Sequence, residues 1–557
     1  MRRQSHAQTA EEAQLPDPVT WGSEIRRATV AGHPCLVLEP HPKSLTEMFR
    51  GVARWAARDC IVHGDRRLTY AEVFSAVPAA ACRLREVGVR HGDRVMLHAY
   101  NTPEWILSLL AIWGCGAMPV LANRWWSAGE VLHSLAAAAP TLLISDLTAP
   151  GPNTSIPHLE ISTLRFAFDA AQASPVIAAE DPEFPLDGED DPAVCVFTSG
   201  SSGTPKGVVL SSRSVIANQH NLLARSRRLP DTLTAEDTQS SALLCTPLFH
   251  VGGITALLMN LLTGSKIVMT VGRFDPGRVL RLLADERVRT FGGVPTMAVR
   301  VLEHPDFETF DLSALQSWPL GGAPVPPGLI DRMRRMLPQL ERRGLGNTWG
   351  MTESGGHLTG AGAKELADRH GTVGRPYPSV ELRIADPDEG GKGEILVRSP
   401  TVMLGYLGGA TDSSDIGVDD QGWLRTGDIG YLDSDGYLYL ESRSKDIVIR
   451  GGENIACSHV EFAITEHPSV IEAAVVGVPH EELGEEVAAV VVTRVGNDLD
   501  EDELRRFVAD RLAYFEVPTV WQIQHEPLPT LAGEKIDKRS VRAELAGRLS
   551  AAEKEVG

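Results

Sequence analysis

The segment from Phe197 to Gly207 combines residue types and spacing that can hold a polyphosphate. Its sequence, FTSGSSGTPKG, places glycines, hydroxyl side chains and a single lysine close together. Glycine lets the backbone curl so that N–H groups point inward, and the hydroxyl groups add neutral hydrogen-bond donors. Lys206 adds a positive charge. The candidate phosphate contacts are Thr198, Ser199, Gly200, Ser201, Ser202, Gly203 and Lys206.

This segment is not the Walker phosphate-binding loop. That loop requires Gly-Lys followed by Ser or Thr, whereas Lys206 lies between Pro205 and Gly207. The apolar run 208–210 that follows is typical of a strand and not of a helix start. A flexible Ser/Gly turn is the structural alternative. The TPKG ending, flanked by apolar runs, favours phosphate binding.

A second segment, Asn347–Glu353 (NTWGMTE), contains groups that suit the rest of a nucleotide. The Trp349 ring offers a face for stacking on a base. Thr352 can donate a hydrogen bond to a phosphate oxygen, and Glu353 is a hard oxygen ligand suited to Mg²⁺. A loop that contains a partly buried tryptophan is the structural alternative.

Taken in order, these segments resemble the motifs of the adenylate-forming superfamily of acyl-CoA synthetases, adenylation domains and luciferases. The resemblance covers about residues 45–545 and is most like fatty-acyl-CoA ligases. Besides the two segments above, it is carried by PLFHVGG (247–253), FGGVPT (291–296), LGGAP (320–324), WLRTGD (423–428), ESRSKDIVIRGG (441–452) and PLPTLAGEKIDK (527–538).

The resemblance implies roles for residues around ATP. Asp428 would accept hydrogen bonds from both ribose hydroxyls, Arg443 would contact the ribose, and Glu353 would hold Mg²⁺. The family often has tyrosine where this chain has Trp349. The remaining expected nucleotide contacts are Gly322, Ala323, Pro324, Asn347, Thr348, Trp349, Gly350 and Thr352.

The resemblance also implies a catalytic lysine near the C-terminus. Lys535 would bridge the substrate carboxylate and the α-phosphate, where its charge offsets developing negative charge. The family usually has glycine directly before this lysine, but here Glu534 precedes it and Gly533 lies one place earlier. Glu534 would either pair with Lys535 or repel phosphate. The residues expected to act in catalysis are Lys535, Thr198, Lys206, Glu353 and His250.

Acid and coenzyme A sites follow from the same resemblance. His250 would be a gate beside the substrate carboxylate, although a lone histidine among apolar residues is often a core residue. Gly293, Gly321 and Met351 would line the acyl pocket. Lys445 would be the pivot of an interdomain hinge in which Ser442 replaces the family's usual glycine. Arg450, Gly451 and Gly452 would meet the coenzyme A arm.

The elements that must position these residues are predicted to form an α/β protein. The resemblance implies a large N-terminal domain of two α/β sheets plus a small β-barrel, and a mobile, smaller C-terminal α+β domain. The predicted division is a tail and extension at 1–44, with residues 1–18 a loose tail, an adenylate-forming domain at 45–443 and a lid at 444–557. Helices are predicted at 70–87, 102–113, 458–467 and 502–512. Strands are predicted at 94–98, 119–121, 141–144, 193–197, 208–210, 380–384, 393–397, 473–478, 487–493 and 520–524.

Composition narrows the class of protein. The 557 residues include 53 Lys and Arg against 73 Asp and Glu, a net charge of −20 that argues against nucleic-acid binding. Seven scattered cysteines without a CxxC pair argue against zinc sites and a disulfide framework and favour a reducing compartment. We expect no signal peptide, no transmembrane segment and a cytoplasmic location. The sequence leaves homodimer formation open.

The implied activity is that of an AMP-forming acid–thiol ligase that uses ATP, Mg²⁺ and coenzyme A. Its predicted substrate is a medium- or long-chain fatty acid, and aryl- or steroid-acid ligation is an alternative. Three further alternatives stay open. They are transfer of the acyl group to a carrier protein or amine, luciferase-like oxygenation, and non-catalytic binding in a chain whose Lys535 is disabled by Glu534.

Overall fold

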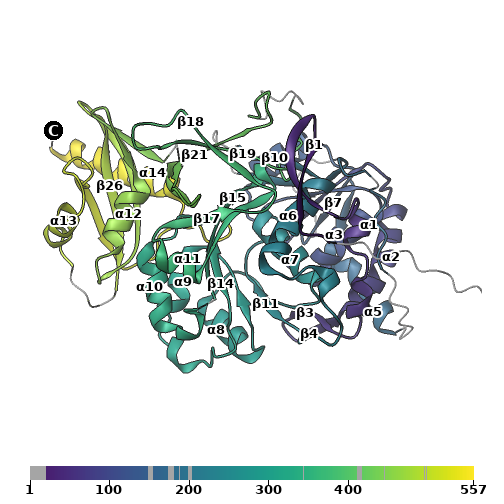
Figure 1. Cartoon of the computed structure of the whole chain (residues 1–557). Helices are drawn as coiled ribbons and strands as arrows, with labels where there is room; N and C mark the ends of the chain where they lie inside the picture. The colour runs from purple at the N-terminus through teal and green to yellow at the C-terminus, as the bar shows by residue number, and fades with distance from the viewer. Residues whose placement is uncertain are drawn as a thin grey trace, which may run out of the picture.

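The computed structural model describes residues 21–147, 155–173, 181–186, 188–198, 204–342, 344–409, 417–443, 446–494, 496 and 499–556. Ser199–Gly203 and Lys445 of the predicted site, and the predicted tail at 1–18, lie outside these ranges. Within them, four large sheets follow one another along the molecule (Figure 1). The first sheet and the C-terminal unit lie at opposite ends, with β14 (Trp318–Gly321), β15 (Leu345–Met351) and β17 (Thr372–Pro376) between them (Figure 1).

The first large sheet carries the glycine-rich segment. Its strand order is β20-β10-β9-β6-β5-β7-β8, parallel from β9 to β8, and β10 pairs antiparallel with both β9 and β20. The strands are β5 (Arg94–His98), β6 (Met118–Leu121), β7 (Leu142–Ser145), β8 (His158–Glu160), β9 (Pro192–Thr198), β10 (Lys206–Ser211) and β20 (Gly405–Tyr406). The helices of this part are α1 (Leu45–Met48), α2 (Tyr70–Glu86), α3 (Pro103–Gly114), α4 (Ala128–Ala138), α5 (Arg165–Ala173) and α6 (Ser212–Ser226).

A second sheet has the order β13-β11-β12-β3-β4 and is parallel except at the β3–β4 hairpin. Its strands are β3 (Asp59–His63), β4 (Arg66–Thr69), β11 (Ser241–Leu244), β12 (Lys266–Met269) and β13 (Thr290–Phe291). Helices α7 (Val251–Leu262), α8 (Pro276–Asp285) and α9 (Pro295–Leu302) belong to this part. Helix α3 is buried along its whole length, and its Trp105 and Trp113 are fully enclosed in the same core as Trp55.

The short strands predicted between residues 371 and 439 belong to a third sheet. Its order is β14-β15-β16-β17-β22-β21-β19-β18, so the short strands predicted between residues 371 and 439 extend the sheet that carries NTWGMTE. The strands are β14 (Trp318–Gly321), β15 (Leu345–Met351), β16 (Gly356–Gly362), β17 (Thr372–Pro376), β18 (Glu381–Ala385), β19 (Gly393–Arg398), β21 (Leu424–Leu432) and β22 (Leu438–Arg443). Helices α10 (Pro327–Met336) and α11 (Ala363–Asp368) accompany them.

The C-terminal unit has a sheet of its own. Alternate residues of β25 point into two apolar clusters, Ala473 and Val475 into one and Ala474 and Val476 into the other, so both faces of the sheet are covered. The elements are β23 (Ile447–Arg450), β24 (Glu453–Ala456), β25 (Val470–His480), β26 (Gly484–Thr493), β27 (Val520–Gln524), α12 (Cys457–Thr465), α13 (Glu501–Ala509) and α14 (Lys538–Val556).

The α/β class with a large N-terminal part and a smaller C-terminal unit is confirmed. The region taken as tail and extension, however, contains a hairpin of β1 (Glu24–Val30) and β2 (His33–Glu39), because charged residues mask the strand pattern in β1. None of the described helices is long and apolar enough to cross a membrane.

Candidate active site

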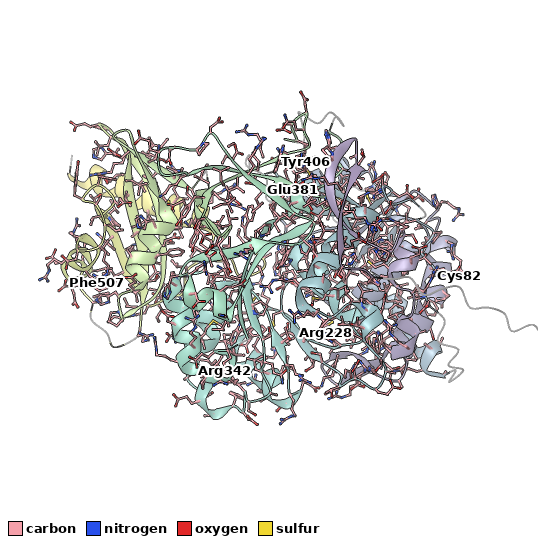
Figure 2. The ribbon with its side chains drawn as sticks, viewed as in Figure 1. Cys82, Arg228, Arg342, Glu381, Tyr406 and Phe507 are labelled. Atoms are coloured by element: carbon pink, nitrogen blue, oxygen red, sulfur yellow. The ribbon has the colours of Figure 1, made fainter. Side chains whose placement is uncertain are left out.

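The two ends of the glycine-rich segment are held by strand pairing. Thr198 at the end of β9 lies opposite Lys206 at the start of β10. The Lys206 ammonium lies 5.4 Å from the centre of the Tyr406 ring, which comes from β20 on the other side of β10. Tyr406 lies in the N-terminal part, far along the molecule from Phe507 of the C-terminal unit (Figure 2). Lys206 is therefore steered by an aromatic ring and keeps an exposed charge.

Tyr406 also connects this lysine to Glu353. Its hydroxyl donates a hydrogen bond to Glu353 Oε1 at 3.3 Å, and burial, helped by the Glu353 charge, raises the pKa of Tyr406. Sequence reasoning missed Tyr406, because it lies far along the sequence from both Lys206 and Glu353. Glu353 lies in a short turn after β15, and its backbone carbonyl accepts a hydrogen bond from the Met403 N–H at 2.9 Å.

A divalent ion fits this position only if the protein and a bound nucleotide hold it together. Among the described residues there is no group of three or more His, Cys, Asp or Glu that could hold a metal. Glu353 offers one carboxylate, which suits Mg²⁺ because that ion usually takes one or two carboxylates and completes its shell with water and substrate phosphates. The donor set therefore fits Mg²⁺ that arrives with a nucleotide.

The predicted ribose contacts form a hydrogen-bonded group. Asp428 on β21 is almost fully buried and accepts a hydrogen bond from Trp349 Nε1 at 2.7 Å and from Arg443 Nε at 2.8 Å. Trp349 is buried with Leu358 in the cluster under the third sheet. The indole thus orients the Asp428 carboxylate as well as offering a ring for stacking. The tyrosine that the family often has here would place its hydroxyl at a different point from Nε1.

The turn after β14 lies beside β15 through a parallel pairing of Gly321 with Thr348. A Cβ on Gly321 would lie 2.3 Å from Thr348 Oγ1, so the missing side chain makes room for Thr348. Asn347 is buried and donates its side-chain amide to the Thr372 carbonyl at 3.0 Å. Ala323 and Pro324 lead from this turn toward α10, and Gly350 has no room for a Cβ because the Gly356 carbonyl would be 1.9 Å away.

Lys535 of the C-terminal unit reaches this turn. A Cβ on Gly322 would lie 3.4 Å from Lys535 Cε and 3.6 Å from Nζ, and Gly322 has a φ of +75°. Lys535 is exposed to solvent, although atoms of both units surround it. Desolvation by these atoms, and secondarily the charge of Arg443, lower its pKa to about 8. Among the described residues no carboxylate forms an ion pair with Lys535.

Glu534 is turned away from Lys535. Its carboxylate accepts a hydrogen bond from Arg300 Nη1 at 2.7 Å, and Thr530 Oγ1 donates to the same oxygen at 3.3 Å. Of the two outcomes expected for Glu534, pairing with Lys535 is wrong, because Arg300 takes its place. The ammonium of Lys535 is therefore not paired with the carboxylate that precedes it in the loop.

His250 joins the acyl side to the same loop. It caps the N-terminal end of α7, and its Nε2 lies 3.2 Å from the Ala532 carbonyl, so Nε2 carries the proton. Burial, with a smaller contribution from Lys535, lowers the pKa of His250 to about 4 and keeps the ring neutral. A lone core histidine would not contact the lysine loop, and this contact favours the predicted gate.

Residues predicted for the acyl pocket lie near a histidine that sequence reasoning missed. Gly293 pairs with Leu320 of β14, next to Gly321, and Met351 ends β15. His357 lies opposite Gly350 in the β15–β16 pair, and its buried Nδ1 has no hydrogen-bond partner among the described residues. Burial lowers the pKa of His357 to about 4. An uncommitted neutral imidazole in this position is a signal that only tertiary structure reveals.

The predicted coenzyme A contacts lie elsewhere on the C-terminal unit. Arg450 at the end of β23 pairs with Glu486 at 2.6 Å, and the Gly451 N–H donates to the Leu483 carbonyl. No hydrogen bond or ion pair in the described ranges joins Arg450, Gly451 or Gly452 to Lys535. Within the described ranges the structure thus brings Lys535 to Gly322 and its loop to His250, and it shows no such link to the residues predicted for coenzyme A.

Comparison with known proteins gives matches over most of the chain. The AMP-binding enzyme family matches residues 48–407, and the AMP-binding enzyme C-terminal domain matches residues 459–532. A feruloyl-CoA synthase of Amycolatopsis sp is 34% identical over 88% of this chain and 99% of its own length. A 3-[(3aS,4S,7aS)-7a-methyl-1,5-dioxo-octahydro-1H-inden-4-yl]propanoyl:CoA ligase of Mycobacterium tuberculosis is 34% identical over 90% of this chain and 98% of its own length.

A solved structure shows the same arrangement of elements. The o-succinylbenzoate CoA synthetase MenE of Bacillus subtilis, in complex with its acyl-adenylate intermediate, matches with a TM-score of 0.71 at 27% identity. The match covers 88% of this chain and 97% of that one.

Proposed function

Because the chain belongs to the AMP-binding enzyme family, we propose that it activates a carboxylic acid with ATP and transfers the acyl group to coenzyme A. One observation carries this proposal. Lys535 of the C-terminal unit lies against Gly322, and its loop contacts His250. Residues from distant parts of the sequence, each matched to one step of adenylate formation, thus share one place.

In the first half-reaction, a carboxylate oxygen attacks the α-phosphorus of ATP and pyrophosphate leaves. In the described part of the chain no carboxylate pairs with Lys535, so its charge is available to the attacking carboxylate and the α-phosphate. The segment from Thr198 to Lys206 would hold the leaving pyrophosphate, and Asp428 would hold the ribose. Mg²⁺ held by Glu353 would supply charge neutralisation on the phosphates when bound.

In the second half-reaction, the thiolate of coenzyme A attacks the activated carbonyl and AMP leaves. We infer that the lid formed by residues 444–557 turns about Lys445 for this step. The turn at Arg450, Gly451 and Gly452 supports this inference, because among the described residues it contacts Leu483 and Glu486, and no hydrogen bond or ion pair joins it to Lys535.

We propose a ring-bearing, oxygenated acid as the substrate, in preference to the fatty acid that the motifs predict. The names of the two relatives above, a feruloyl-CoA synthase and a bicyclic-propanoate CoA ligase, support this choice. His357 supports it as well, because its Nδ1 has no hydrogen-bond partner among the described residues and could donate to a keto oxygen or exchange a hydrogen bond with a hydroxyl group.

The test is pyrophosphate release with Mg-ATP across a panel of hydroxycinnamic, polycyclic keto and fatty acids, with and without coenzyme A. Thioester that appears only with coenzyme A supports the ligase, and strongest turnover of a ring-bearing acid supports the substrate class. Strongest turnover of a fatty acid would restore the motif-based prediction. Release without thioester would point to a carrier-protein or amine acceptor, and no release with any acid would contradict the proposed activity.

A further inference from the structure

Arg300 and Glu534 form an ion pair that crosses between the two units beside the catalytic lysine. Arg300 lies in the last turn of α9 in the N-terminal part, and Glu534 directly precedes Lys535 in the C-terminal unit. Nitrogen and oxygen are 2.7 Å apart, and both side chains are 19% exposed. This pair can exist only while the lysine loop is docked on the N-terminal part.

Arg300 makes further contacts with the C-terminal unit. Its Nε lies 3.3 Å from Glu472 Oε1 and its Nη2 donates to the Leu528 carbonyl at 3.2 Å, while Glu472 Oε2 accepts the Leu528 N–H. Glu472 is only 4% exposed. One guanidinium therefore holds both the start and the end of the segment that leads to Lys535.

The backbone of Glu534 argues that its side chain has a use. Its φ is +63°, in the left-handed region that favours glycine and strains other residues. Burial raises the pKa of its carboxyl, while Arg300 and Thr530 oppose that shift. A strained and partly desolvated glutamate at this position needs a compensating interaction, and the Arg300 contact supplies one.

We propose that Arg300 and Glu534 are positioning residues for adenylate formation: their ion pair docks the lysine loop so that Lys535 faces the α-phosphate. The inference rests on the proposed function for the role of Lys535. It predicts an effect confined to the first half-reaction, because the pair must separate before the C-terminal unit can take another arrangement.

The chain offers a matched control. Arg494 of the C-terminal unit pairs with Glu303 of the N-terminal part at 2.7 Å, so it also crosses between the units, but it does not touch the lysine loop. If any interdomain ion pair had the same effect, Arg300→Gln and Arg494→Gln would behave alike. If docking of the loop matters, only Arg300→Gln impairs adenylation.

The first experiment measures each half-reaction separately. We expect Arg300→Gln and Glu534→Gln each to slow single-turnover adenylate formation about tenfold, with the double variant no slower than the worse single variant. Thioester formation from supplied acyl-adenylate and coenzyme A should stay within about twofold, as should both steps in Arg494→Gln. Independent, multiplied losses in the double variant, or equal losses in both half-reactions, would overturn the proposal.

A second experiment needs no turnover and separates this inference from the proposed function. Hydrogen exchange is followed in the full-length protein at the Leu531 and Glu534 amides, which donate within the lysine loop. Faster exchange in Arg300→Gln, but not in Arg494→Gln, supports docking even if no acid is activated. Unchanged exchange in Arg300→Gln would refute docking even if the wild-type protein proves to be an active ligase.

Discussion

The two lysines of the candidate site have unlike surroundings. Lys206 starts a strand within a sheet, lies over the Tyr406 ring and has Glu353 one hydrogen bond further away. Lys535 lies in a loop between two units, with Arg443 as a charged neighbour and its pKa lowered to about 8. The N-terminal part thus presents a lysine beside an aromatic–carboxylate pair, and the C-terminal unit brings one that has no counter-ion among the residues the structure describes.

This difference indicates different tasks. A lysine fixed on a strand and steered by a ring suits binding of the phosphate tail, which is needed whenever ATP is held. A lysine that lacks a counter-ion gains most when negative charge develops next to it. The loop that carries Lys535 also depends on contacts between units, whereas the β9–β10 pair does not.

Replacing each lysine by methionine is the strongest test of this comparison. We expect Lys535→Met to lower the adenylation rate by about 10²–10³-fold, because one preorganised transition-state charge is lost. Thioester formation from supplied acyl-adenylate should be nearly unaffected. Lys206→Met should act mainly through the KM for ATP.

Folding stability serves as the control for that pair. Lys535 has no ion-pair partner among the described residues, so the free energy of unfolding of Lys535→Met should change by less than about 1 kcal/mol. A large loss of stability would show that Lys535 is structural. Equal losses in kcat for the two variants would break the comparison.

The pH dependence tests the lowered pKa of Lys535. Its charged form prevails below pH 8 and is lost as pH rises through about 8, instead of near the ordinary value of 10.5. The kcat/KM of adenylation should therefore fall above pH 8, approaching about tenfold per pH unit. His250, with its pKa near 4, adds no inflection between pH 6 and 8.

Lys535→Arg provides the matched control, because a guanidinium stays charged throughout this range. Its profile should be flat above pH 8 even if its absolute rate is lower. A fall of the same shape in Lys535→Arg would assign the inflection to another group.

Much of the fold could be predicted from the sequence, because buried strands are short apolar runs. Strands β5 and β27 have the predicted bounds, and α2 differs by one residue at its end. Strand β1 was missed because its exposed EIRRATV sequence lacks a buried face of its own. Local pattern thus predicts elements with a buried side and fails for a hairpin at the surface.

The candidate site was predictable only as far as its motifs reach. Lys535, Gly322 and His250 came from separate motifs, and the structure brings them together. Nothing near Glu534 in the sequence predicts Arg300, because 234 residues separate them. Tyr406 and His357 were missed for the same reason: their significance lies in contacts, or missing contacts, with distant segments.

A substitution beside the predicted ribose contact tests the N-terminal part separately from Lys535. Trp349→Phe keeps a ring but removes the Nε1 donor to the buried Asp428. We expect the KM for ATP to rise about fivefold, equivalent to about 1 kcal/mol, because Arg443 continues to hold the other carboxylate oxygen. The pH inflection of Lys535 should not move, and a shift of that inflection would show that the two regions are coupled.

The acid side provides the smallest expected effect. His357→Leu removes a neutral ring whose Nδ1 has no hydrogen-bond partner among the described residues, so no protein hydrogen bond of that atom is lost. We expect kcat/KM for a hydroxylated or keto acid to fall about threefold relative to its deoxygenated analogue, the value of one neutral hydrogen bond. His357→Asn, which keeps a polar group, should retain more of that preference. If both variants lower the rates for both acids equally, His357 shapes the site without recognising an oxygen. The acid-binding region would then act on every substrate alike, as the Lys206 region is expected to do.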